Sequence, residues 1–90
     1  MNKFPKDHVF ILPHSQEYQN MFAISLDEIL LTLNEPDLHE GVSDDRYTAE
    51  KIIGNRRIYI YYYLTLPLQR KENEVYAVVD FVAFSEEEKK

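Results

Sequence analysis

Residues 57–66, with the sequence RIYIYYYLTL, constrain the fold of this chain most strongly. β-Branched and aromatic residues dominate the stretch, and neither Gly nor Pro interrupts it before Pro67, which is typical of a β-strand. Because side chains alternate between the faces of a strand, one face is aliphatic apart from Tyr62 and the other holds most of the tyrosines. The first face carries Ile58, Ile60, Tyr62, Leu64 and Leu66; the second carries Arg57, Tyr59, Tyr61, Tyr63 and Thr65. Since both faces can pack, we expect a central strand with helices on the aliphatic face.

The composition limits the classes of protein to which the chain can belong. Its 90 residues, 44% of them hydrophobic, suffice for one domain with a single modest core. The absence of Cys excludes a disulfide scaffold, a thiolate zinc site and a cysteine nucleophile. No apolar run approaches the ~18 residues of a membrane span, and residues 1–7 lack the apolar centre of a signal peptide. We therefore expect a cytoplasmic protein with no membrane segment and no cofactor.

The net charge of −6 bears on the partners of the protein. A surface that holds nucleic acid needs Lys and Arg to neutralise phosphates, so RNA is a less favoured partner than protein. The acidity is partly concentrated in residues 85–90, which are expected to form a charged, disordered tail. We expect residues 1–7 to be a short N-terminal segment and residues 8–84 to be the single domain.

Two helices are predicted in the first half of the chain. A short apolar run at residues 9–12 predicts a first strand that Pro13 ends, and Ser15 is expected to cap a helix beginning at Gln16. Ser25 and Glu28 have the spacing of a capping box. The helix that follows it presents Leu26, Ile29, Leu30 and Leu33 on one face, and it should end before Pro36.

The second half of the chain predicts an antiparallel hairpin and a last strand. Residues 37–45 are polar and aperiodic and are expected to be a loop. Gly54 and Asn55 form a two-residue turn between strands at 46–53 and 56–66. A polar connection at 67–74 then leads to an apolar strand at 75–84. The fold class is therefore α+β: strand, helix, helix and three antiparallel strands, with the two helices packed on one face of a small sheet.

Asp80 is the least expected residue of the predicted strands. It lies among apolar residues, on the face predicted for Val78 and Val82, so its carboxylate must be exposed or paired. An ion pair with Arg56 or Arg57 across the sheet is the structural alternative to a functional carboxylate.

Arginines and tyrosines form a second group of candidates. Arg46, Arg56 and Arg57 are expected to cluster near the ends of the hairpin, beside Tyr59, Tyr61 and Tyr63. Arg and Tyr on a sheet are typical of single-stranded nucleic-acid binding and equally of protein interfaces. The net charge favours the protein interface, with another protein or a second copy as the partner. No metal site is expected, because no third ligand accompanies His8 and His14 at a diagnostic spacing.

A family resemblance adds to these interpretations. The chain resembles, over residues 8–84, a family of small bacterial proteins of uncharacterised function related to RelE/ParE-type toxins. The resemblance is carried by His8-Val9, His14, Glu17, Ile24-Ser25-Leu26-Asp27-Glu28-Ile29, Leu33-Asn34-Glu35-Pro36-Asp37 and Gly54-Asn55-Arg56-Arg57-Ile58.

The resemblance implies a candidate chemistry. Some relatives are ribonucleases of type II toxin–antitoxin pairs, and the matching positions imply His14 as a general base, with Arg46 and Arg57 on the phosphate. Tyr18 and Phe22 stand where similar chains often have Arg, so phosphate contacts are lost. The resemblance therefore implies a toxin-like fold that acts mainly through protein contacts, with the ribonuclease toxin as the alternative.

Overall fold

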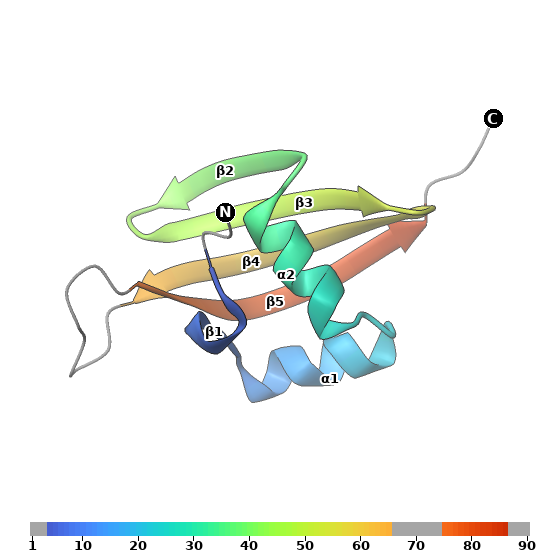
Figure 1. The fold of residues 1–90 in the computed structure, drawn as a ribbon, viewed down its shortest axis with the longest axis horizontal. Helices are drawn as coiled ribbons and strands as arrows, with labels where there is room; N and C mark the ends of the chain where they lie inside the picture. The colour runs from blue at the N-terminus through green and yellow to red at the C-terminus, as the bar shows by residue number, and fades with distance from the viewer. Residues whose placement is uncertain (1–3, 66–74, 87–90) are drawn as a thin grey trace.

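The computed structural model describes residues 4–65 and 75–86, which form one sheet and two α-helices (Figure 1). The α+β class predicted from the sequence is confirmed. The elements are the 3-10 helix η1 (Lys6–His8), β1 (Val9–Ile11), α1 (Pro13–Met21), α2 (Leu26–Asn34), β2 (Leu38–Ser43), β3 (Arg46–Ile53), β4 (Arg56–Thr65) and β5 (Tyr76–Glu86). The connection predicted at 67–74 lies outside the described residues, as do residues 87–90 of the predicted tail.

The sheet has five strands in the order β1-β5-β4-β3-β2, so β4 is central as its sequence predicts. The pairs β2–β3, β3–β4 and β4–β5 are antiparallel, whereas β1 pairs with β5 in parallel. The sheet is therefore mixed. Four strands follow the helices in the described residues, whereas the sequence predicted three. The predicted two-residue turn is present, with Gly54 at a φ of +65° that favours glycine.

The missing strand is β2, where a loop had been predicted. All six of its residues are exposed, so its sequence has no buried alternation to indicate a strand. The strand is held in place by its backbone pairing with β3 and not by burial of its side chains. A bulge interrupts this pairing between Gly41 and Ser43. Asp44 and Asp45 then turn the chain into β3, with Asp45 at a φ of 60°.

The helices begin differently from one another. α1 starts at Pro13, whose fixed φ suits the first helical position, and not at Gln16. Ser15 is fully buried inside α1, so the prediction that it caps the helix was wrong. The capping box of α2 is confirmed, because Ser25 Oγ accepts from the Glu28 amide at 3.1 Å and Glu28 accepts from the Ser25 amide at 2.9 Å.

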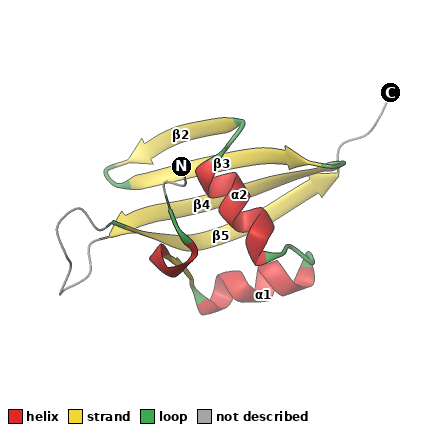
Figure 2. Cartoon of the chain, viewed as in Figure 1, coloured by secondary structure: helices red, strands yellow, loops and turns green. Residues whose placement is uncertain are grey.

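α2 lies over one face of the sheet (Figure 2). The core lies between this helix and the aliphatic side chains of that face. Its centre is formed by the fully buried side chains of Ile29, Ile58, Ile60, Val79 and Val82. Leu30, predicted on the same helix face as Ile29, is only partly buried. Phe4, within the predicted N-terminal segment, also joins this core, with its amide donating to Asn34 Oδ1 at 2.6 Å.

Candidate functional site

The second face of the sheet, turned away from α2, carries most of the candidate residues. Strand register shows which side chains share this face, because Cα partners on adjacent strands point to the same side. Four of the rows that cross it are Phe10, Val78, Tyr63, Arg46 and Ser43; Phe81, Tyr61, Thr48 and Glu40; Ala83, Tyr59, Glu50 and Leu38; and Ser85, Arg57 and Ile52. We call these four rows the open face.

Large apolar side chains are exposed on the open face. Phe10 is 52% exposed, Leu38 48%, Ile52 44% and Phe81 39%. Tyr59, Tyr61 and Tyr63 are half-buried between them. The sequence predicted the three tyrosines as a binding surface, and the structure places them together on one face. The sequence did not predict the exposed apolar residues beside them, because these residues lie on four different strands and only the pairing of the strands brings them onto one face.

Ring contacts connect the open face to α1. Phe81 meets Tyr18 edge-to-face at 5.4 Å between ring centroids and Tyr59 at 6.4 Å. At the other end of β5, Phe10 stacks on Tyr76 at 5.2 Å. These contacts hold the aromatic rings in fixed positions, which lowers the entropy that they lose when a partner binds.

Asp80 is the extra residue of a β-bulge and does not share a face with Val82 as predicted. Tyr61 pairs with Phe81 and Tyr62 with Val79, which leaves Asp80 without a partner residue on β4. Bulges re-aim side chains, and this one turns Asp80 toward α1. His14 Nε2 lies 2.7 Å from the Asp80 carbonyl oxygen and 2.8 Å from Asp80 Oδ1. The partner of Asp80 is therefore His14, and the ion pair with Arg56 or Arg57 was a wrong prediction.

The two contacts of His14 determine which nitrogen carries its proton. A carbonyl oxygen only accepts, so Nε2 must be the donor in the neutral imidazole. Nδ1 is then the acceptor, and the side chain is 55% exposed. A carboxylate on one nitrogen with a basic second nitrogen is an arrangement that can abstract a proton from a bound group.

Arg46 lies near this pair, on the neighbouring part of the open face. Its Nη1 donates to Tyr61 Oη at 3.3 Å, and its guanidinium lies 5.5 Å from the centroid of the Tyr63 ring. The pKa of Arg46 is raised above its ordinary value, first by the hydrogen bond to Tyr61 and, to a smaller extent, by the charge of Asp80. Asp80 therefore binds His14 directly, whereas it acts on Arg46 only through its charge.

Arg57 and Arg56 lie away from Arg46, so the predicted cluster of three arginines does not form. Arg57 pairs with Ile52, six residues along β3 from Arg46, which is about 20 Å at ~3.3 Å per residue. Arg57 forms an ion pair with Glu50 at 3.5 Å. Arg56 lies on the helical side, where Nη2 donates to Glu28 Oε2 at 2.6 Å and Nη1 to the Phe22 carbonyl at 3.1 Å. Arg56 is a structural residue that fastens the α1–α2 connection to the sheet.

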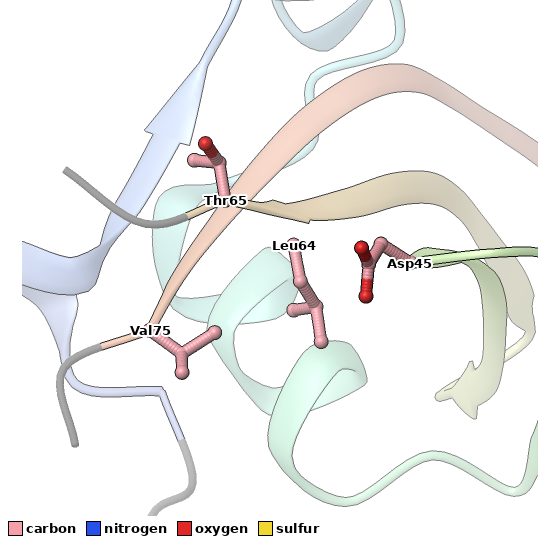
Figure 3. A pocket seen from close by; sticks show the side chains of 4 residues that line it. All are labelled: Asp45, Leu64, Thr65 and Val75. Carbon is pink, nitrogen blue, oxygen red and sulfur yellow. The ribbon is translucent and has the colours of Figure 1, made fainter. Parts of the chain in front are cut away.

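A pocket of about 380 Å³ opens at the end of β4 (Figure 3). Its described lining consists of Asp45, Leu64, Thr65 and Val75. Among these four described residues, Asp45 has the one charged side chain. These four described side chains do not by themselves supply the converging polar groups of a catalytic centre.

In residues 4–65 and 75–86 no three His, Asp or Glu side chains gather closely enough to hold a metal ion. Within the same residues, neither helix has the length and apolar character needed to cross a bilayer. Comparison of the chain with protein-family models, with curated proteins and with solved structures finds no match.

Proposed function

We propose that this protein is a small bacterial interaction domain that uses its open face to bind a second copy of itself. In this proposal the fold is toxin-like and related to RelE/ParE-type toxins, with the nuclease chemistry lost. The compartment is the cytoplasm, which the cysteine-free composition allows.

The observation that carries the proposal is the exposure of Phe10, Leu38, Ile52 and Phe81 on one sheet face. Apolar side chains scattered singly are ordinary, whereas a contiguous apolar and tyrosine-rich surface is typical of an interface. Tyr and Arg are also the residues that most often dominate binding free energy. Two such faces packed together would remove these side chains from water, as in a β-sandwich.

The charges on the open face favour a second copy over RNA. Arg46 and Arg57 accompany Glu40 and Glu50, so the face carries both signs, which a two-fold related copy can complement. Glu50 also neutralises Arg57 within the same chain. The overall charge of −6 makes two copies repel at long range, so association should strengthen as salt screens that repulsion.

Light scattering over a concentration series tests this proposal. The wild type should change from monomer to dimer as concentration rises, and Phe81→Arg should shift that transition to much higher concentration. Met21→Arg is the matched control, because Met21 is 71% exposed on α1 and belongs to none of the strand rows of the open face. A wild type that stays monomeric at every concentration, or a control that dissociates as much as Phe81→Arg, would eliminate the dimer.

A ribonuclease toxin is the second candidate function. Its support is the hydrogen-bonded pair of His14 and Asp80, together with Arg46, which donates to Tyr61 and whose pKa the charge of Asp80 helps to raise. His14 Nδ1 would take the proton of a ribose hydroxyl, and Arg46 would stabilise charge on the phosphate. Arg57 has no part in this version, since it lies at the far end of the hairpin.

Growth of a bacterial host on induced expression separates the two functions. The ribonuclease candidate requires growth arrest by the wild type, relief by His14→Ala and Arg46→Ala, and continued arrest by Arg57→Ala. Normal growth with the folded wild type excludes the toxin activity and leaves the interaction domain.

A further inference from the structure

The two edges of the sheet differ in how well they are protected. An edge strand presents unpaired backbone donors and acceptors, and natural proteins blunt such edges to prevent unwanted strand pairing. β1 is blunted, because it has only three residues and Pro13 follows it closely. Gln16 Nε2 also donates to the Ile11 carbonyl oxygen at 2.9 Å, which occupies an acceptor at this edge.

β2, at the opposite edge, is not protected in these ways in the part that precedes its bulge. It is six residues long, all of them exposed, and its sequence LHEGVS includes neither Pro nor Lys. Among the described residues, β3 is the one strand that pairs with β2, so the outer backbone groups of β2 face away from the sheet. Figure 1 shows β2 as the outermost strand, with no described element beside its outer edge.

β2 is nevertheless held firmly against β3. Asp37, just before it, accepts from the Ile52 amide at 2.9 Å and donates from its own amide to the Glu50 carbonyl at 2.8 Å. His39 Nε2 and Tyr62 Oη are hydrogen-bonded at 2.7 Å, which links the strand to a buried core residue. An edge that is both open and fixed in place needs little reorganisation to accept another strand.

We propose that β2 binds an extended basic segment of a partner protein by strand addition. The backbone of β2 would supply the hydrogen bonds, and the side chains of one face would supply the specificity. Leu38 and Glu40 project to the open-face side of β2, and Val42, 57% exposed, follows them. The complementary segment has Lys or Arg between two apolar residues at alternate positions, because cross-strand pairs of this kind are stabilising.

A second copy is a poorer occupant of this edge. Antiparallel pairing of two β2 strands would bring Glu40 of one copy near Glu40 of the other, and it would add the flanking Asp37 and Asp44 carboxylates of both. Like charges across a strand pair are destabilising. Leu38 and Glu40 belong both to the open face and to this edge, but only strand addition uses the outer backbone groups of β2, so the two proposals can fail separately.

The test is a nuclear magnetic resonance titration of the full-length protein with two capped peptides. One has the sequence Thr-Val-Thr-Lys-Thr-Val-Thr, and the other has Glu in place of Lys. The wild type should bind the Lys peptide about fivefold more tightly than the Glu peptide, with amide shift changes concentrated in β2 and the facing part of β3. The variant Glu40→Lys should reverse this preference.

Three results would overturn the proposal: no binding of either peptide, shift changes centred away from β2, or an unreversed preference in a folded Glu40→Lys. Met21→Arg serves as the control variant, because Met21 is exposed on α1 and belongs neither to β2 nor to the rows of the open face. Its peptide preference should equal that of the wild type. Loss of the preference in this control would show that the β2 edge does not set it.

Discussion

The imidazole of His14 donates from Nε2 to Asp80, at 2.7 Å from the carbonyl oxygen and 2.8 Å from Oδ1. This contact joins the start of α1 to the bulge of β5, at the point where β1 has ended and can no longer pair with β5. The side chain of His14 thus supplies a donor to a backbone acceptor at the bulge, where the register of β5 with β4 shifts. His14 has a structural role in this arrangement whether or not its Nδ1 also acts as a base.

Replacing His14 should destabilise the fold modestly. His14→Ala leaves the Asp80 carbonyl without its donor, and we expect the free energy of unfolding to fall by ~0.5–1.5 kcal/mol because the site is partly exposed. Chemical denaturation measures this difference. Glu17→Ala, also exposed on α1, is the control and should change stability little. Equal stability of His14→Ala and the wild type would show that the contact contributes nothing.

Glu28 should make stability depend on acid pH. The pKa of Glu28 is lowered from 4.5, first by the hydrogen bond from the Ser25 amide and then by Arg56, while burial opposes the shift. A folded pKa below the unfolded value gives stability that is present above pH 4.5 and is lost as pH falls through the folded pKa. Glu28→Gln should therefore be less stable than the wild type by ~1–2 kcal/mol near neutral pH, with the difference shrinking in acid. A difference that is constant with pH in denaturation curves would contradict this.

Tyr62 should make stability depend on alkaline pH. Burial raises the pKa of Tyr62 from 10.0 to about 12, so the unfolded chain loses this proton first as pH rises. The stability that it contributes is complete below pH 10.0 and declines between that value and about 12. Tyr62→Phe lacks this decline, although it also loses the hydrogen bond to His39. Parallel alkaline denaturation profiles for the two proteins would disprove the assignment to Tyr62.

Ala23 is expected to be a site of removable strain. It follows α1 with a φ of 52°, a left-handed conformation that costs a residue with a Cβ roughly 1–2 kcal/mol. Glycine adopts this conformation without strain, so it suits this position after a helix. Because glycine also gives the unfolded chain more conformational entropy, which offsets part of the gain, Ala23→Gly should stabilise the fold by ~0.5–1 kcal/mol. Thermal unfolding measures the gain. Glu17→Gly, inside α1, should instead be destabilising by up to ~1 kcal/mol, and a loss of stability in both variants would contradict the strain.

Elements that carry their own local signals could be predicted from the sequence. Gly54 and Asn55 specify the β3–β4 hairpin through turn chemistry, and Ser25 with Glu28 specifies the start of α2. The division of β4 into a buried aliphatic face and a tyrosine face follows from alternation alone. These features need no knowledge of distant residues.

Features that depend on distant pairing could not be predicted in the same way. β2 is ordered by β3 and has no buried side chain of its own, and the bulge at Asp80 exists only relative to β4. The bulge changes which face Asp80 occupies, so the contact with His14 was missed although both residues had been singled out. Arg46 and Arg57 were expected together because both were assigned to hairpin ends, but those ends are opposite ones.

The most direct test of the open face as a self-association surface is a dilution series followed by backbone amide chemical shifts. The proposal predicts concentration-dependent shifts from micromolar to millimolar protein, concentrated at Tyr59, Tyr61 and Phe81, with α2 unchanged. Shifts that do not vary with concentration, or that vary mainly on α2, would contradict the central claim that two copies meet through the open face.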